Sequence, residues 1–413
     1  MLNVLRQRHL LILWLALVFS SIGDRLYEIA VVWLAIQLTG SEAGFVLATQ
    51  AASRLIFGLV GGVYADRLNR RKLMITTDVT RALVVLSVPL AAAFGEINLW
   101  HLMLVASVVG GLNAFFEPAL IASLPHLTTT ARDLNAFNGL IDVTSRLARV
   151  IGPGLAGVLL AIMPMSQFFT IDAFSFGLSA VAVFIIGKGF TWRAHASDTD
   201  HTVKGIWSDI QEAGQALRLR PHVLWCIAAN SLTNLLWGAV FVVGLALMID
   251  ARFQGNAGMY GLVVSAYGVG NVISNIVVSH LNVQRHVQLI FAGTAILGFG
   301  FLLVSLAQDL SVLLIVAAFT AIGGPMKDLP LLVMIQREFP PQITGKVFSV
   351  RAIATNVGYS LGLALAAPLY TLLPLTVGMA SLSCFVLGVG SLGIVVFWRH
   401  KPQPITYKKA AAV

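Results

Sequence analysis

The chain has 413 residues and a formal net charge of +9, with 57% hydrophobic and only 11% charged residues. Soluble domains carry about 25% charged residues, so this composition excludes an ordinary water-soluble protein. Two cysteines, Cys226 and Cys384, lie far apart inside apolar runs, which excludes a disulfide framework or a cysteine metal cluster.

Apolar runs recur along the whole chain, and each is long enough to cross a hydrocarbon core of about 30 Å as a helix. We expect the first run to be kept as a helix, because it is too long for a signal-peptide core and lacks a convincing cleavage site. The expected fold is an all-α membrane protein with two six-helix bundles. The twelve expected spans lie near residues 10–38, 43–65, 73–94, 99–124, 136–163, 167–188, 222–249, 257–280, 288–308, 310–335, 347–372 and 375–398.

The placement of lysine and arginine predicts the orientation. With a cytoplasmic N-terminus, 19 of the 27 basic residues fall in cytoplasmic segments, seven lie within spans, and only Arg252 falls outside. This distribution follows the positive-inside rule and puts both termini in the cytoplasm. Because the charges are dispersed among short loops along one leaflet, they favour lipid headgroups as partners and argue against nucleic acid.

A long polar segment near the middle separates the two expected bundles. Within it, apolar residues recur at helical spacing from Ile206 to Leu217, which predicts an amphipathic helix on the membrane surface; a solvated connector is the alternative. Two short segments also repeat between the halves at offsets of 212 and 210. The expected divisions are a bundle at 1–188, a linker at 189–220, a bundle at 221–400 and a tail at 401–413.

The first span carries two carboxylates on one face. Asp24 and Glu28 are four residues apart, with Tyr27, a candidate for the substrate cavity, beside them. Two ionised carboxylates on one face repel each other, so one of them could hold a proton near neutral pH. This pair is therefore our first candidate for proton coupling, and a structural ion pair with another helix is the alternative.

The second span carries Arg54 near its centre, with Gln50 one turn away. Arginine suits a bidentate grip on a carboxylate, either Glu28 or an anionic substrate. We therefore place Arg54 and Gln50 in a substrate cavity, with a structural pair to the first helix as the alternative.

Residues 62–72 form a short cationic turn between two apolar runs, so they must lie at a membrane surface. Their order resembles G-x-L-A-D-R-x-G-R-K, the loop between helices two and three of major facilitator superfamily transporters. The resemblance implies that Asp66 helps to hold the two halves closed on the inside; the alternative is that the basic residues only set the topology. The implied gate motif consists of Gly62, Asp66, Arg67, Arg70 and Arg71.

The fifth span resembles the exporter pattern G-x8-G-x3-G-P-x2-G-G, with two glycines replaced by alanine. Small residues at this spacing let helices approach closely, and a proline bends the helix. In the family this bend accompanies antiport, so the resemblance favours export over uptake, although small-residue packing also occurs without it. The matching residues are Gly139, Gly152, Pro153 and Gly157.

Further segments, 113–119, 134–138 and 172–176, look like the branch that contains macrolide and siderophore exporters. Charges inside spans are costly, so each needs a partner or a water-filled cavity. Asp78 with Arg81 is expected to be a structural pair, and Asp172 a helix-packing acceptor. The remaining candidate for proton coupling is Glu117, and the remaining candidates for the substrate cavity are Asp142, Arg146, Arg149, Lys327 and Asp328.

Asp142 and Arg146 are spaced to pair within one helix, whereas Arg149 could reach Glu117 or a ligand. Lys327 and Asp328 follow Gly323-Gly324-Pro325, a deformable stretch that could act as a gate or simply as a kink.

The residues and the resemblance together predict proton-coupled efflux of a drug or siderophore across the bacterial inner membrane by a monomer. Proton-coupled uptake of an organic anion is the alternative, and a channel or membrane sensor is the alternative from another class. An enzyme is not expected, because the sequence has no phosphate loop, nucleophile elbow or HExxH motif. No cofactor or metal is expected; a proton or solute gradient would supply the energy.

Overall fold

The computed structural model describes residues 2–95, 97–160, 162–187, 203–253, 257–281 and 284–398, apart from the side chains of 2–3, 59–67, 150, 203–206 and 341. Within these ranges all regular structure is helical. Ten segments are long and apolar enough to cross a membrane. One of them, Arg8–Gly58, covers the first expected span and most of the second, and the helix Ala131–Leu159, which carries several charges, is not among the ten. The expected count of twelve spans therefore stays a prediction.

The N-terminal half is built from long helices with short connections. Polar side chains cap several of them: Asn69 accepts from the Lys72 amide at 3.1 Å, and Asn98 accepts from the His101 amide at 2.9 Å. The elements are η1 (Leu2–Arg6), α1 (Arg8–Thr39), η2 (Gly40–Glu42), α2 (Ala43–Arg67), α3 (Arg70–Ala93), α4 (Leu99–Leu127), α5 (Ala131–Leu159) and α6 (Ser166–Ile186).

The C-terminal half departs from regular helices in two places. A π-helical stretch, η4 (Trp237–Gly244), lies between α8 (Pro221–Leu236) and α9 (Leu245–Phe253). The segment expected as one span at 310–335 is broken at residues 321–322, directly before Gly323-Gly324-Pro325. The other elements are α7 (Val203–Arg218), α10 (Ala257–His280), α11 (His286–Leu306), α12 (Leu310–Thr320), α13 (Gly323–Glu338), α14 (Pro341–Leu372) and α15 (Leu375–Val396).

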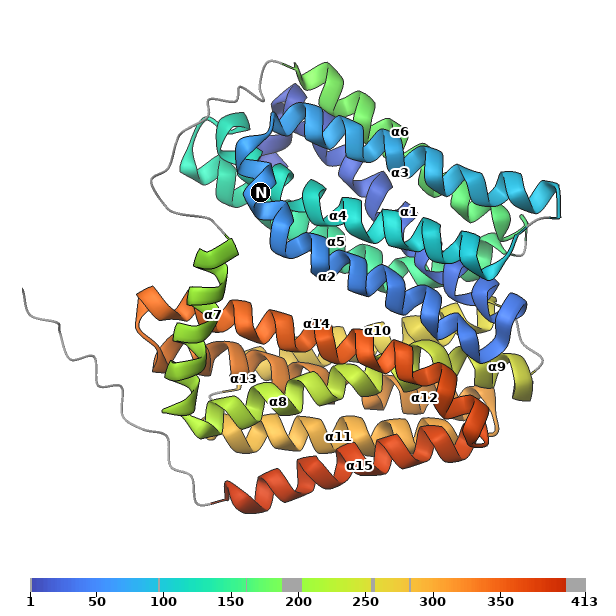
Figure 1. Ribbon diagram of the computed structural model, residues 1–413, viewed down its shortest axis with the longest axis vertical. Helices are drawn as coiled ribbons and strands as arrows, with labels where there is room; N and C mark the ends of the chain where they lie inside the picture. Colours follow the sequence, from blue (N-terminus) through green and yellow to red (C-terminus); the bar gives the residue numbers. More distant parts are fainter. Residues whose placement is uncertain are drawn as a thin grey trace, which may run out of the picture.

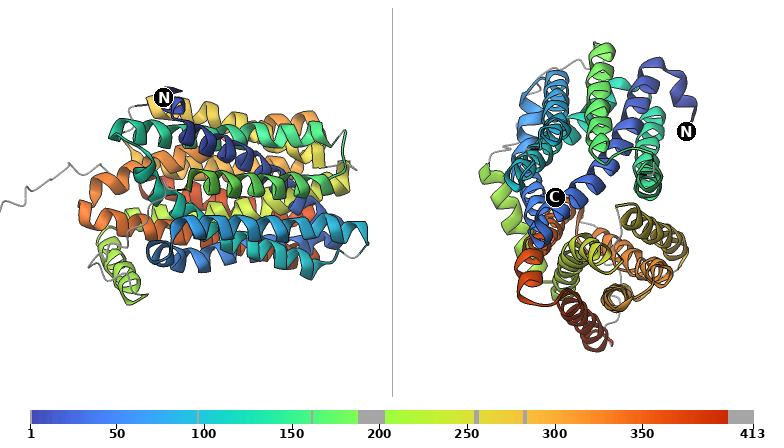
Figure 2. Two further views of the ribbon diagram at one scale, coloured as in Figure 1. Left: turned by 90° about the horizontal axis from the view of Figure 1, so that it is seen from above. Right: turned by 90° about the vertical axis from the view of Figure 1, so that its right-hand side faces the viewer.

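The two halves form separate helix bundles that lie side by side (Figures 1 and 2). They meet mainly where α5 packs on α10 and α2 packs on α14. Both contacts use glycine, because a Cβ added to Gly44 would lie 2.3 Å from the Leu363 carbonyl oxygen, and one added to Gly261 would lie 2.5 Å from that of Pro153. The halves thus touch backbone to backbone.

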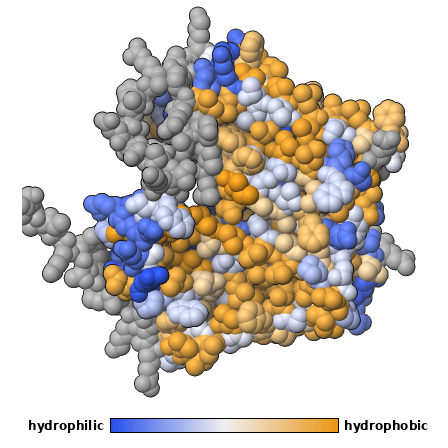
Figure 3. Space-filling model, in the orientation of Figure 1, coloured by the Kyte–Doolittle hydropathy of each residue, from blue (hydrophilic) through white to orange (hydrophobic). Residues whose placement is uncertain are grey.

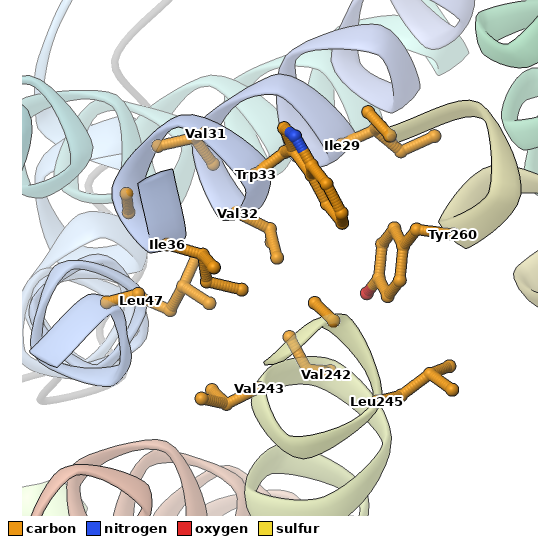
Figure 4. Packing of buried hydrophobic residues seen from close by; sticks show 14 of the residues in the cluster. Ile29, Val31, Val32, Trp33, Ile36, Leu47, Val242, Val243, Leu245 and Tyr260 are labelled. Carbon is orange, nitrogen blue, oxygen red and sulfur yellow. The ribbon is translucent and has the colours of Figure 1, made fainter. Parts of the chain in front are cut away.

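One end of the interface is closed by an apolar seal to which both halves contribute (Figure 4). Trp33 and Ile36 at the end of α1 and Leu47 at the start of α2 belong to the same buried cluster as Val243 and Tyr260 of the second half. We call this end of the molecule the sealed end.

The face of the molecule seen in Figure 3 is largely apolar. Large hydrophobic side chains such as Leu83, Phe174 and Phe184 are more than half exposed. Soluble monomers rarely expose contiguous apolar patches of this kind, and a lipid environment removes the cost.

Helix α7 packs on α14 and is drawn beside the second bundle (Figure 1). Lys346 of α14 pairs with Asp209 at 2.9 Å and with Glu212, while Ala213 and Leu217 are buried in a cluster with residues of the second half. The amphipathic pattern thus corresponds to a helix that lays its apolar side on the protein.

Candidate functional site

Three ion pairs with solvent-accessible side chains lie on helices of the N-terminal half. In α1, Arg25 pairs with Glu28 at 2.5 Å, and the Glu28 side chain is 51% exposed. A Cβ at Gly152 of α5 would lie 2.6 Å from Arg25 Cβ, so this glycine provides the room for the arginine stem. The exporter-like motif of α5 thus supports a charged residue of α1.

Arg54 of α2 binds a different carboxylate from the one expected. Its guanidinium donates to Glu117 of α4 at 3.0 Å, and both side chains are about 60% exposed. The expected grip of Arg54 on Glu28 is wrong, because Glu28 is held by its neighbour Arg25 one turn away. Gln50 lies where α2 crosses α4, with its carbonyl oxygen 2.3 Å from the position of a Cβ at Gly110.

Helix α5 contributes Asp142 and Arg146, which pair at 2.8 Å, so the expected pair within one helix is confirmed. Among the described residues, no carboxylate lies within ion-pair distance of Arg149, and the expected contact with Glu117 is wrong because Arg54 occupies Glu117. The charges of Arg25, Arg146, Asp142 and Glu28 all act on Arg149. Arg149 therefore has no ion-pair partner in the described structure, although the charges of Asp142 and Glu28 reach it.

The C-terminal half places two cations on one carboxylate. Asp328 accepts from Lys327 at 3.0 Å, from Arg351 at 3.4 Å and from Asn230 at 2.7 Å. Thr355 in turn donates to Asn230 at 3.1 Å. Asp328 remains 47% exposed, whereas Lys327 is almost buried. This cluster joins α8, α13 and α14 and carries one excess positive charge.

Tyrosines of the second half lie within electrostatic reach of the first. The charge of Glu28 acts on both Tyr260 of α10 and Tyr359 of α14, and those of Arg25 and Arg54 also act on Tyr359. Neither tyrosine was expected at the site, since each resembles an ordinary core aromatic in the sequence. The contact of Asn230 with Asp328 could have been suspected from the sequence more readily than the tyrosines, because the internal repeat pairs Asp24 with Asn234, one turn from Asn230.

The gate motif is only partly described. The side chains of Gly62, Asp66 and Arg67 lie outside the described residues, so the contact expected of Asp66 stays a prediction. Arg70 donates to the Ala122 carbonyl at 2.8 Å and Arg71 to the Phe184 carbonyl at 2.7 Å. These bonds join α3 to α4 and α6, within one half.

The motif of α5 lies on the interface between the halves. A Cβ at Gly157 would lie 3.4 Å from the Gly258 carbonyl oxygen of α10, and the Pro153 carbonyl faces Gly261. Gly139 lies nearer the N-terminal end of the same helix. Two of the motif residues therefore face the opposite bundle, beside the sealed end.

Inside the N-terminal half lies a fourth charged group. Arg81 pairs with Asp78, as expected, and also donates to Asn113. Asp172 is not the packing acceptor we expected, because both of its carboxylate oxygens are buried without a hydrogen-bond partner in the described structure. Tyr27 is 2% exposed and packs edge-on against Phe169, so it faces the interior of this bundle.

Comparisons with known proteins identify the chain. Residues 1–396 match the family described as "Transmembrane secretion effector". The chain belongs to this family. It is 25% identical over 405 residues to the uncharacterised MFS-type transporter YfiS of Bacillus subtilis, covering 94% of this chain and 93% of the relative. The expected membership of the major facilitator superfamily is confirmed, and the chain is a multi-pass membrane transporter and not an enzyme.

Two further relatives are efflux proteins. The chain is 26% identical over 380 residues to the multidrug efflux pump Tap of Mycolicibacterium fortuitum, covering 89% and 90% of the two chains. It is 20% identical over 361 residues to macrolide efflux protein A of Streptococcus pyogenes, covering 86% and 87%.

Solved structures confirm the fold. A POT family transporter in complex with 5-aminolevulinic acid matches with a TM-score of 0.71 at 13% identity, covering 95% and 96% of the two chains. A bacterial homologue of the lysosomal transporter Spinster, in an inward-facing conformation, matches with a TM-score of 0.68 at 12% identity, covering 97% and 99%.

Proposed function

We propose that this transporter exports a small organic molecule from the bacterial cytoplasm by alternating access, driven by protons that enter the cell. It would sit in the inner membrane with twelve spans and both termini in the cytoplasm. The observation that carries the proposal is the set of solvent-accessible ion pairs on spans of both halves, beside an interface sealed at one end. Charges that only held helices together would be expected in dry packing.

The direction of transport is supported by two independent features. Drug efflux proteins are among the relatives along most of the chain, and the α5 motif faces the opposite bundle. On the proposed topology the sealed end, where α1 ends, faces outward, and the ion pairs would then be reached from the cytoplasm. This is the state in which an exporter loads its cargo.

The substrate is proposed to be a drug-like molecule with an anionic or strongly electron-rich group, and a carboxylate siderophore fits the same description. Arg149 lacks a carboxylate partner in the described structure, and Lys327 and Arg351 share Asp328, so both halves offer positive charge. Tyr359 of α14, on which the charges of Glu28, Arg25 and Arg54 act, adds an aromatic ring with a hydroxyl group.

Transport into inverted membrane vesicles tests the proposal. Macrolides and other drugs, and a carboxylate siderophore, are offered outside, and accumulation is expected only when the vesicle lumen is acidic. Glu28→Gln and Asp24→Asn should lose this gradient dependence, while Asp133→Asn, an exposed carboxylate at the start of α5, should keep it. Accumulation that ignores the pH gradient would refute proton coupling, and full activity of both α1 variants would remove α1 from it.

A counterflow experiment separates a carrier from a channel. Vesicles preloaded with unlabelled solute should take up labelled solute faster through a carrier that alternates, whereas a channel shows no such effect. An enhancement that disappears in Arg149→Gln but persists in Asp133→Asn would connect the carrier activity to the proposed site.

A further inference from the structure

Apart from the exposed ion pairs, three carboxyl groups and one arginine lie within electrostatic reach of one another inside the N-terminal bundle. Asp24 comes from α1, Asp78 and Arg81 from α3, and Asp172 from α6. The charges of Asp24 and Arg81 both act on Asp172, and that of Asp24 acts on Asp78, so the four groups are neighbours. We call them the buried acidic cluster.

The arginine of this cluster is already occupied. Arg81 donates to Asp78 and Asn113, and its guanidinium lies over the rings of Phe116 and Phe176, at 4.7 and 4.3 Å from their centroids. Its side chain is 3% exposed. Arg81 therefore compensates Asp78 and gives no hydrogen bond to the other two carboxyl groups.

Asp172 is fully enclosed inside the N-terminal bundle. It is 0% exposed, and neither carboxylate oxygen has a hydrogen-bond partner. The hydroxyl of Ser175 donates instead to the main-chain carbonyl of Asp172, at 2.8 Å. A Cβ at Gly23 would lie 2.7 Å from Asp172 Oδ1, so the bare backbone of α1 covers the carboxyl group closely.

The surroundings of Asp172 contain more negative than positive charge. Helix α6 packs on α1 and α3. The titratable or charged groups that act on Asp172 from these helices are Asp24, Glu28 and Tyr27 of α1 and Arg81 of α3, with Asp78 bound to Arg81. An ionised carboxylate needs hydrogen bonds or a counter-charge when it is removed from water, and a neutral carboxylic acid needs far less.

We propose that Asp172 holds a proton in this state and that the buried acidic cluster is a proton store of the transporter. Asp24 is half-buried, and the exposed Glu28 lies one helical turn further along α1. A proton leaving the Asp172 carboxyl group would pass to the Asp24 carboxylate, leaving Asp172 ionised, and then from Asp24 to Glu28 or water. The protonation of Asp172 does not depend on the proposed function. Only the use of this proton in transport rests on the proposed proton coupling.

Infrared spectroscopy of the purified, full-length protein at neutral pH tests the protonation directly. The carbonyl stretch of a protonated carboxylic acid is separate from that of a carboxylate. Asp172→Asn, which is nearly isosteric with the neutral acid, should remove the absorbance of one such group. Asp133→Asn is the matched control, because hydrogen bonds from Thr130 and Thr129 hold the pKa of this exposed carboxyl group below its usual range. An unchanged acid band in Asp172→Asn would overturn the proposal.

A second measurement keeps the test decisive if the variant does not fold. The native protein labelled with ¹³C at the aspartate carboxyl carbons should show a protonated acid at neutral pH that exchanges slowly with deuterium. Absence of that band would equally overturn the proposal. Transport then provides a separate result: Asp172→Asn should lose gradient-driven accumulation and retain counterflow. A native acid band with gradient-independent transport would support the store while refuting proton coupling.

Discussion

The contact between α5 and α10 provides the sharpest test of alternating access. A Cβ at Gly261 would lie 2.5 Å from the Pro153 carbonyl oxygen, about 0.9 Å short of an ordinary contact of 3.4 Å. Because that oxygen belongs to the backbone of the opposite half, it cannot rotate away as a flexible side chain could. Gly261→Ala should therefore push the two halves apart at the sealed end.

The magnitude follows from the cost of overpacking, which is about 1 to 3 kcal/mol for added methyl groups in a packed interior. If the sealed end opens as a unit when the transporter faces outward, the added methyl group destabilises only the sealed state. The equilibrium should then shift toward the open state by about 5- to 150-fold.

Distances between spin labels at the sealed end measure this shift. Cysteines at Glu42 in η2 and Asp250 in α9, both exposed and on opposite halves, report the separation once Cys226 and Cys384 are replaced. Gly177→Ala in α6 is the matched control, because a Cβ there meets nothing within 4 Å. A distance distribution in Gly261→Ala equal to that of Gly177→Ala would refute the reasoning.

Four further predictions concern stability. Arg81→Gln leaves Asp78 buried without its counter-charge and should destabilise the protein by about 3 to 5 kcal/mol, measured as a lower thermal unfolding temperature in detergent; an unfolding temperature like that of the native chain would contradict the buried pair. Lys346→Gln removes a partly exposed contact and should leave the unfolding temperature nearly unchanged, while hydrogen exchange in α7 rises. Unchanged exchange would show that apolar contacts alone hold α7. Thr130→Ala removes the cap of α5 and should cost about 1 kcal/mol of stability. The pKa of Asp133 is lowered from 3.8, so the stability that its carboxylate contributes should be present above that pH and disappear as the pH falls through the lower folded value. An Asp133→Asn variant should therefore differ from the native chain in unfolding temperature at neutral pH and converge with it in acid.

Sequence reasoning located the helices well because a membrane-spanning helix has a strong and local signal. The helical segments of the structure correspond closely to the expected apolar runs, and the break before Gly323 falls where glycine and proline interrupt one of them. The pairs Asp78–Arg81 and Asp142–Arg146 were also foreseen, since a spacing of three or four residues brings side chains together on any helix.

Contacts between distant helices were harder to predict. Helical periodicity says which face a residue lies on but not which neighbouring helix that face meets. Glu28 was therefore considered as a partner of Arg54 beside an anionic substrate, and Glu117, which Arg54 binds, was not. Asp172 was misjudged for a related reason: whether a buried carboxyl group has a donor depends on the register of α1 against α6, which the close approach at Gly23 determines. The sequence alone contains no measure of that register.

The attachment of α7 has a mechanical consequence. Ala213 and Leu217 of α7 are buried with residues of the second half, and Lys346 of α14 binds Asp209 of α7. Helix α7 should therefore move together with the second bundle as one rigid body. Trp207 of the same helix is exposed and therefore open to a binding protein. An antibody fragment that binds at Trp207 should slow the movement of the second bundle without contacting the charged residues between the two halves.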